Sequence, residues 1–244
     1  MKLNCDIGES FGSWSMGADA EIMPYIDMAN IACGFHASDP QHMSDTVALA
    51  HKHNVVIGAH PSYPDLLGFG RKDMVFSASE IINMVLYQVG ALQAICSSHG
   101  TAVSYVKPHG ALYNLMMRDT QTYITLLRAM SSLDMKIPLM IMSNHRREEF
   151  IQLAKKFDVE LIFEAFCDRS YTDEGSLQSR NIKGAVYSDI EKIKKQALKL
   201  IKENSVISSS GKEIPIVAQS ICVHGDSDFA VNAVKQVRKI LTVL

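Results

Sequence analysis

Short apolar runs alternate with amphipathic stretches along the whole chain. Several of the runs contain almost no polar residue, which is typical of strands in a parallel sheet because helices cover both of its faces. The runs lie at residues 2–8, 28–34, 55–60, 103–108, 137–143, 160–166 and 214–225. The pattern therefore predicts seven strands.

Helical periodicity fills the gaps between these runs. Pro40 follows a Ser-Asp pair that can cap a helix, and Ser77 and Glu80 stand at the spacing of a capping box. Residues 188–205 and about 229–244 each carry an apolar stripe at helical spacing. We therefore expect helices between the strands.

This order of elements predicts an α/β fold in a single domain, residues 1–244. Seven strand–helix units in 244 residues average roughly 35 residues each, which is the size of a βα unit. The fold that we favour is a closed or nearly closed parallel (β/α) barrel of seven strands. A doubly wound open sheet is the alternative, because periodicity alone does not separate the two. The segment 168–187 lacks clear periodicity, and loops of this length are usually functional or mobile.

Polar and mostly ionisable residues end every predicted strand. They are Asp6, Glu9, His36, His60, Lys107, His109, Asn144, His145, Glu164, Asp168, Arg169, His224 and Asp226. In parallel α/β folds the carboxyl ends of the strands share one face, so we expect these side chains to form a ring. Their mixture suits acid–base catalysis or binding of an anionic group. Such a ring can also hold a divalent metal, although no HExxH or similar motif specifies one.

Two loops add candidate binding groups. In the loop after the third strand, Gly68 and Gly70 permit close approach of the backbone to a ligand beside Arg71. His224 and Asp226 stand just before the last helix, whose free first amides can bind an anion. Both loops are expected on the face that carries the ring.

Composition and charge argue against several classes of function. The formal net charge is −2 and no basic block stands out, so nothing indicates binding of nucleic acid or of an anionic membrane. The N-terminus lacks the features of a signal peptide and we expect no apolar run long enough to span a bilayer, which predicts a cytoplasmic protein. Five cysteines without a CxxC pair argue against a disulfide framework. P-loop and GxGxxG motifs are absent from the sequence.

Six segments together resemble the LamB/YcsF family. They are residues 3–12, 30–40, 58–71, 106–114, 164–180 and 221–226, in the order in which the family has them. They span almost the whole chain, so the resemblance is specific. One departure is Cys167, where the family usually has alanine before the Asp-Arg pair.

The resemblance implies a fold like the glycoside hydrolase/deacetylase barrels. It also implies the role of the A subunit in an ATP-dependent 5-oxoprolinase, which opens 5-oxo-L-proline to L-glutamate. That reaction consumes ATP, with Mg²⁺, and two water molecules, and it requires partner subunits B and C. ATP can phosphorylate the stable amide of the ring, after which water opens it.

We assign roles to the ring residues by position and chemical type. The catalytic candidates are Asp6, Glu9, His36, Lys107, His109, Glu164 and Asp168. The candidates for binding ATP or the substrate carboxylate are Arg71, Arg169, His224 and Asp226, with Lys107 also a candidate for phosphate. The candidate metal ligands are His60 and His36. Two other functions compete with this one: a stand-alone metal-dependent deacetylase or amidohydrolase, and a lactam- or carbohydrate-binding subunit.

Overall fold

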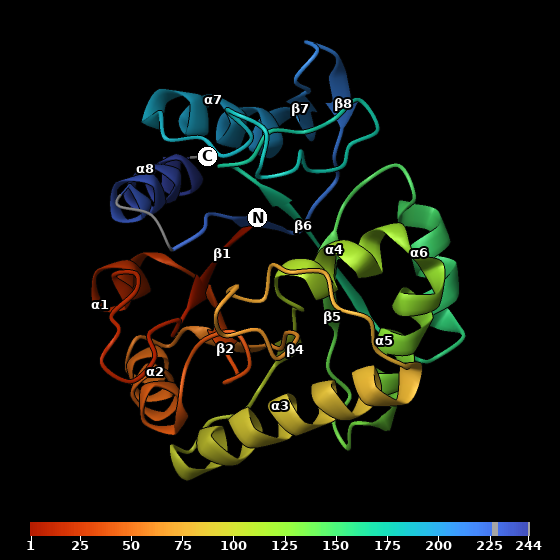
Figure 1. Cartoon of the computed structure of the whole chain (residues 1–244). Helices are drawn as coiled ribbons and strands as arrows, with labels where there is room; N and C mark the ends of the chain where they lie inside the picture. Colours follow the sequence, from red (N-terminus) through yellow and green to blue (C-terminus); the bar gives the residue numbers. More distant parts are fainter. Residues whose placement is uncertain (226–228, 244) are drawn as a thin grey trace.

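Seven parallel strands close into a barrel (Figure 1). The structure, a computed structural model, describes residues 1–225 and 229–243. The barrel strands are β1 (Lys2–Ile7), β2 (Met28–Ala32), β3 (Val56–His60), β4 (Tyr105–Val106), β5 (Leu139–Met142), β6 (Leu161–Phe166) and β9 (Ser220–Cys222). Ser220 pairs with both Lys2 of β1 and Glu164 of β6, which closes the ring. The predicted barrel is confirmed, and the open sheet is wrong.

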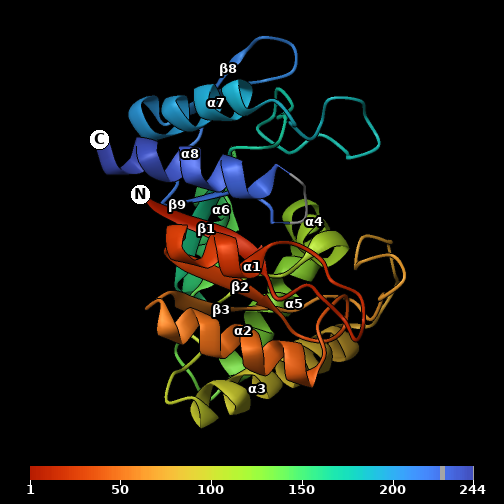
Figure 2. The same ribbon diagram turned by 90° about the vertical axis from the view of Figure 1, so that its left-hand side faces the viewer.

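Helices surround the strands on all sides (Figures 1 and 2). They are α1 (Asp19–Ile22), α2 (Pro40–Lys52), α3 (Ala78–Ser98), α4 (Gly110–Arg118), α5 (Thr120–Ser132), α6 (Arg147–Lys155), α7 (Ile190–Glu203) and α8 (Ala230–Val243), with a short 3₁₀ helix at Met23–Tyr25. In Figure 2 both termini lie on the left, and the loops that follow the strands gather on the right. Figure 1 therefore looks onto the carboxyl ends of the strands.

The caps expected from the sequence are present. The side chain of Asp39 accepts hydrogen bonds from the backbone amides of Gln41 and His42 at the start of α2. Ser77 and Glu80 form a complete capping box at the start of α3. These bonds satisfy amides that lack a partner within the helix, which fixes where each helix begins.

Helix α3 corrects the expectation that no segment could span a membrane. By length and composition alone, its 21 residues would suffice. In the structure Ile81, Val85, Val89 and Leu92 are buried along one face, and the helix packs against α2, α5 and β3. Helices that cover a barrel are buried along one stripe, so the apolar residues of α3 are explained by its packing against the barrel.

The seventh predicted strand, 214–225, is wrong as a single element. Its first part is β8 (Glu213–Pro215), which pairs with β7 (Ser205–Ile207) in a separate antiparallel hairpin. Only β9 enters the barrel. Pro215 explains the division, because proline has no N–H to donate and is excluded from a strand that is hydrogen-bonded on both sides.

Polar side chains fill part of the barrel interior. Asn4 and Asp6 alternate with apolar residues on β1 and therefore point to the same side of the strand. Asn30 stands opposite Asp6 on β2. All three are buried, with at most 5% of their surface exposed. The barrel thus has a polar core that opens toward the carboxyl ends of its strands.

Candidate active site

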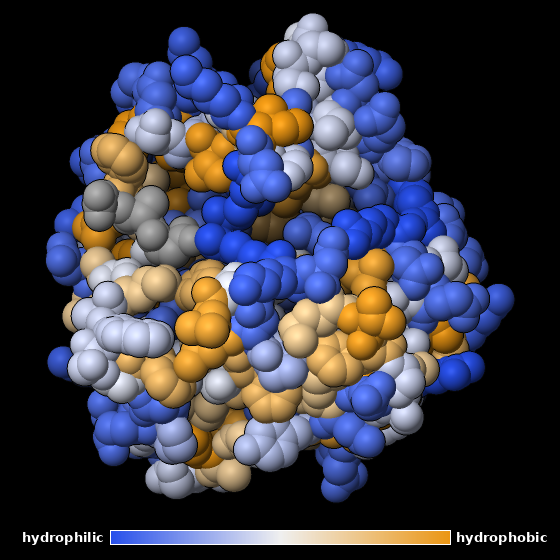
Figure 3. All heavy atoms as spheres, viewed as in Figure 1, coloured by the Kyte–Doolittle hydropathy of each residue, from blue (hydrophilic) through white to orange (hydrophobic). Residues whose placement is uncertain are grey.

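The carboxyl ends of the strands surround a cavity of about 590 Å³, a size common for sites that bind small molecules. Ring residues that line it are Asp6, His60, Lys107, His109, Asn144, His145, Arg169 and His224, together with Arg71 from the loop after β3. Strongly hydrophilic side chains gather across the centre of this face in Figure 3. Asp226, a predicted binding residue, lies outside the described residues.

An ion-paired lysine forms the floor of the cavity. The Nζ of Lys107 lies 3.1 Å from Asp6 Oδ1 and 3.1 Å from Glu164 Oε2. Burial lowers the pKa of Lys107, but the carboxylates of Asp6 and Glu164 reverse that effect and hold the pKa well above its usual value. Burial raises the pKa of Asp6, while Lys107 and then His60 bring it well below the usual value. The ion pairs therefore hold the side chains of Lys107, Asp6 and Glu164 in place.

Glu164 acts from behind Lys107. It is completely buried and is not among the residues that line the cavity. The hydroxyl of Tyr113 donates to its Oε1 at 2.8 Å, and the amide of Asn4 donates to its Oε2 at 3.2 Å. From this place Glu164 pairs with Lys107, whereas the sequence suggested a direct catalytic role for it.

An amide and a phenol complete this network, and neither was predicted from the sequence. The amide nitrogen of Asn30 donates to Asn4 Oδ1 at 2.9 Å and to Asp6 Oδ1 at 2.8 Å. The Tyr105 hydroxyl donates to Asn30 Oδ1 at 2.6 Å. An available signal was the asparagine inside the otherwise apolar run of the second strand, because a buried amide needs partners.

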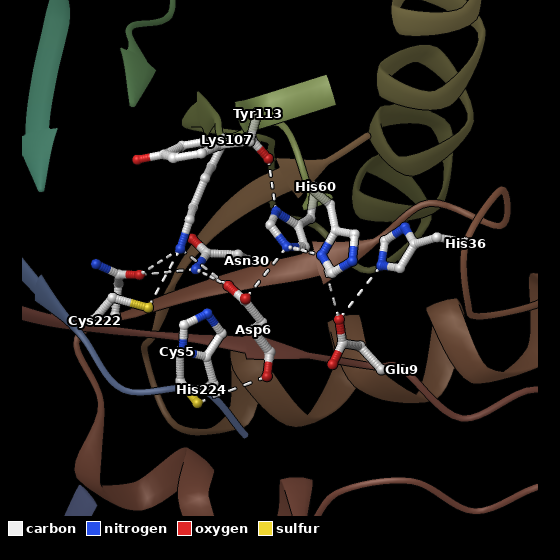
Figure 4. A network of polar contacts seen from close by, with 12 residues as sticks. Cys5, Asp6, Glu9, Asn30, His36, His60, Lys107, Tyr113, Cys222 and His224 are labelled. Atoms are coloured by element: carbon white, nitrogen blue, oxygen red, sulfur yellow. Dashed lines mark hydrogen bonds and ion pairs between the residues drawn. The ribbon is translucent and has the colours of Figure 1, made fainter. Parts of the chain in front are cut away.

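Three imidazoles and a carboxylate form a second buried cluster beside the floor. Glu9, His36, His60 and His109 each offer one ligand atom, and these atoms all lie within 4.8 Å of one another. Figure 4 shows Glu9 and His36 facing each other next to His60. The rings of His36 and His109 stack with their centroids 3.9 Å apart. The two predicted metal ligands, His60 and His36, thus meet here with two predicted catalytic residues, in a set that could hold a metal ion.

Asp168 and His224 form a pair at another side of the cavity. Asp168 Oδ2 accepts from the backbone amide of His224 at 2.9 Å and lies 2.8 Å from its ring Nδ1. Burial raises the pKa of Asp168, but His224, followed by Arg169, lowers it below its usual value. His224 lines the cavity and Asp168 is not among the lining residues, so Asp168 orients the imidazole.

Five arginines are among the residues that line the cavity. They are Arg71, Arg118, Arg146, Arg169 and Arg180. Arg118 pairs with an aspartate and Arg146 with a glutamate. Guanidinium groups suit carboxylate and phosphate ligands.

The segment 168–187 forms one wall of the cavity and positions Arg169. The guanidinium of Arg169 donates to the carbonyls of Ala185 at 3.2 Å and Gln178 at 2.6 Å. Burial, and then the nearby Arg180, lowers the pKa of Arg169 to about 10, so the group stays charged at neutral pH. Arg180, which was not predicted from the sequence, also faces the cavity.

Comparison with known proteins places the chain among curated relatives. The profile of the LamB/YcsF family matches residues 1–243. The A subunit of a 5-oxoprolinase from Vibrio cholerae is 50% identical over 241 residues, which cover 99% of this chain and 97% of the relative. The second of the 5-oxoprolinase A subunits from Pseudomonas putida is 51% identical over 239 residues, which cover 98% and 93%.

Solved structures share the fold. A lactam utilization protein from Thermus thermophilus superposes with a TM-score of 0.91 at 37% identity, covering 100% of this chain and 96% of that one. A putative cellobiose-phosphate cleavage protein from Enterococcus faecalis gives a TM-score of 0.53 at 13% identity, covering 99% and 89%. The second likeness concerns the fold alone.

Proposed function

The chain belongs to the LamB/YcsF family, and from that membership we propose that it is the A subunit of an ATP-dependent 5-oxoprolinase. The observation that carries the proposal is the cavity, which combines ionisable groups at its floor with arginines among its lining residues. 5-Oxoproline is small, carries one carboxylate, and presents an amide that needs acid–base chemistry to open. We place the protein in the cytoplasm, where ATP with Mg²⁺ is available, and with subunits B and C as its partners.

The arginines suit the anionic parts of the reactants. Arg71, Arg169 and Arg180 line the cavity, where they can meet a carboxylate or a phosphoryl group. Planar guanidinium groups bind such anions through two hydrogen bonds at once. The amide of the substrate then points inward, toward Asp6 and the imidazoles.

His224 is the proposed general acid–base group. Its Nδ1 is engaged by Asp168, which leaves Nε2 as the nitrogen that exchanges a proton with substrate or water. An ionised aspartate fixes the tautomer of such a histidine and stabilises the imidazolium when it forms. Asp168 is therefore a positioning residue, and His224 is the group that contacts substrate.

Lys107 has a different proposed role from the one that its sequence position suggested. Its Nζ already contacts Asp6, Glu164, Asn4 Oδ1 at 3.2 Å and Cys222 Sγ at 3.3 Å. An ammonium group has three hydrogens, so this one has none to spare for phosphate. We assign it to holding Asp6 ionised and in place.

The first test is glutamate release from 5-oxoproline, with and without ATP. The chain should be assayed alone and mixed with candidate B and C subunits. Release that requires both ATP and the mixture is the expected result. The proposal fails if no mixture releases glutamate, or if release by this chain alone is independent of ATP.

A metal-dependent amidohydrolase is the second candidate, because of the cluster of Glu9 with three histidines. It predicts hydrolysis of an amide by the chain alone, without ATP and with a bound metal. The same assay separates the two functions, since omission of ATP stops only the oxoprolinase. A purely lactam- or carbohydrate-binding subunit would instead tolerate replacement of His224 without loss of turnover in the mixture.

A further inference from the structure

We propose that Glu9, His36, His60 and His109 form a binding site for one divalent transition metal ion. The inference does not depend on the 5-oxoprolinase reaction, because it rests on the geometry of these four side chains.

Two backbone carbonyls fix the tautomers of two imidazoles. The Nδ1 of His60 lies 2.6 Å from the carbonyl oxygen of Lys107, and the Nε2 of His109 lies 2.9 Å from the carbonyl oxygen of Phe69. A carbonyl only accepts hydrogen bonds, so each of these nitrogens carries its hydrogen. In the neutral rings, the other nitrogens are then both unprotonated.

Those two other nitrogens point at each other. His60 Nε2 and His109 Nδ1 are 2.9 Å apart inside the protein. Two lone pairs at that separation repel, and a cation between or beside them removes the repulsion. A metal ion can supply that positive charge, and so can a proton on His60 Nε2, which also lies 3.4 Å from Asp6 Oδ2.

The rest of the cluster favours a metal over a single proton. Glu9 Oε1 lies 3.4 Å from His36 Nε2 and 3.7 Å from His109 Nδ1. A shared proton needs only two rings, whereas four ligand atoms within 4.8 Å of one another suit a metal. Histidines that bind metals usually donate their other N–H to a carbonyl or carboxylate, as His60 and His109 do here.

The separations suit a small transition metal. Bonds of about 2.0–2.1 Å to nitrogen in a tetrahedron place the ligand atoms roughly 3.3 Å apart. The observed 2.9, 3.4 and 3.7 Å bracket that value, so small shifts of the side chains would complete the geometry. Three imidazoles and one carboxylate favour Zn²⁺ or a similar ion over Mg²⁺, which prefers oxygen ligands.

The fold holds the four ligands together from separate parts of the barrel. Glu9 follows β1, His36 follows β2, His60 ends β3, and His109 caps α4 just after β4. A glycine fits over them: a Cβ on Gly70 would lie 2.8 Å from His36 Cβ and 2.9 Å from His109 Cδ2. The loop therefore packs closely against the rings and leaves no room for a side chain at that position.

The site has access to the cavity. His60 and His109 line it, whereas Glu9 and His36 are not among its lining residues. A metal held there would meet substrate or water on one side only. In general, such an ion polarises a carbonyl or activates bound water.

The test measures metal binding directly, apart from any activity. The purified chain should be stripped with a chelator, dialysed, and titrated with Zn²⁺ by calorimetry, and its content measured by elemental mass spectrometry. We expect one ion per chain and a higher melting temperature with Zn²⁺. Titration with Co²⁺ should give the visible absorption of a four-coordinate site.

Variants locate the ion. His36→Gln, His109→Gln and Glu9→Gln should each weaken Zn²⁺ affinity by at least about 10–100-fold, which is the loss seen when even an outer partner of a metal ligand is removed. His145→Gln is the matched control, because His145 lines the same cavity but lies outside the cluster and should leave affinity unchanged. Glu9→Gln keeps the shape of the side chain. A loss of Zn²⁺ affinity in this variant therefore supports the site even where a histidine variant misfolds.

Two results would overturn the inference. One is substoichiometric Zn²⁺ uptake by the wild-type chain under these conditions, with a proton shared between His60 and His109 detected by nitrogen NMR. The other is wild-type affinity in folded Glu9→Gln and His109→Gln variants, which would place the ion elsewhere. A millimolar excess of Mg²⁺ should not displace the bound Zn²⁺, and displacement would equally reject a transition-metal site.

Discussion

At the scale of single residues, the floor of the cavity depends on one cation between two acids. Lys107 forms ion pairs with both Asp6 and Glu164, and the exposed fraction of its own surface is 2%. Buried ion pairs are costly to break, because removing one partner leaves the other charge without compensation. We therefore expect these residues to contribute both to the stability of the fold and to function.

Lys107→Ala should abolish turnover and also destabilise the protein. The substitution leaves the buried carboxylates of Asp6 and Glu164 without their cation. We expect the free energy of unfolding to fall by about 3–5 kcal/mol. Urea denaturation measures it, with Lys136→Ala as control, since Lys136 makes an exposed ion pair. Equal unfolding midpoints for wild type and Lys107→Ala would contradict the buried ion pair.

Asp168→Asn should lower turnover while leaving the protein folded. Asparagine keeps the size of the side chain but removes the charge that orients and supports His224. We expect kcat of the assembled complex to fall by about 10²–10⁴-fold. Asp158→Asn, at an exposed ion pair, is the control. Near-normal kcat would remove Asp168 and His224 from the scheme.

The same aspartate should shape the stability of the chain in acid. Burial raises the pKa of Asp168, but His224 and Arg169 bring it below its usual value. A lowered pKa gives stability that is complete above the unfolded pKa of about 4 and is lost as pH falls through the folded value. We expect the free energy of unfolding to decline less steeply below pH of about 4 in Asp168→Asn. Parallel declines in the two proteins would show that the pKa is not lowered.

At the scale of elements, neighbouring strands depend on close steric fit. A Cβ on Gly58 of β3 would lie 2.1 Å from Tyr105 Cζ of β4. The glycine leaves space for the ring whose hydroxyl supports Asn30 inside the barrel. Helix α3 contains the contrasting case, because a Cβ on Gly90 would meet nothing within 4 Å.

Gly58→Ala should therefore destabilise the barrel, and Gly90→Ala should not. Overpacking of a core costs about 1–3 kcal/mol. The clash at Gly58 is with a buried ring whose hydroxyl is hydrogen-bonded to Asn30. Alanine in place of an exposed helical glycine adds about 0.5–1 kcal/mol of stability. Thermal unfolding of both variants measures the difference. Stabilisation of both would mean that Tyr105 moves aside at no cost.

At the scale of the whole molecule, charges of both signs gather at the cavity. Five arginines line the cavity, while the carboxylates of Asp6, Glu9 and Glu164 are buried. We expect these arginines to attract an anionic substrate, and salt to weaken that attraction.

Arg180→Gln should raise KM for 5-oxoproline in the assembled complex. A hydrogen bond between charged groups contributes about 1.5–3 kcal/mol, which corresponds to about 10-fold or more in KM. The effect should shrink as ionic strength rises. Arg128→Gln on α5 is the control, since that exposed arginine is not among the residues lining the cavity. An unchanged KM at low salt would exclude Arg180 from substrate binding.

The sequence by itself determined the elements and the face that carries the site. Apolar runs marked the strands, Asp39 and Ser77 marked helix starts, and ionisable residues marked the strand ends. These features are local, because the side-chain periodicity and the capping bonds involve residues close in the chain.

Only the tertiary structure decided whether the barrel closes, which side chains line the cavity, and which side chains contact one another. Ser220 pairs with β1 and β6, which are both far from it in the sequence, so no local pattern could reveal it. Glu164 and Lys107 look alike as strand-end residues, yet only Lys107 lines the cavity. The facing lone pairs of His60 and His109 depend on carbonyls supplied by other segments. Such relations depend on how the strands pack together around the barrel, which the sequence pattern of each strand does not specify.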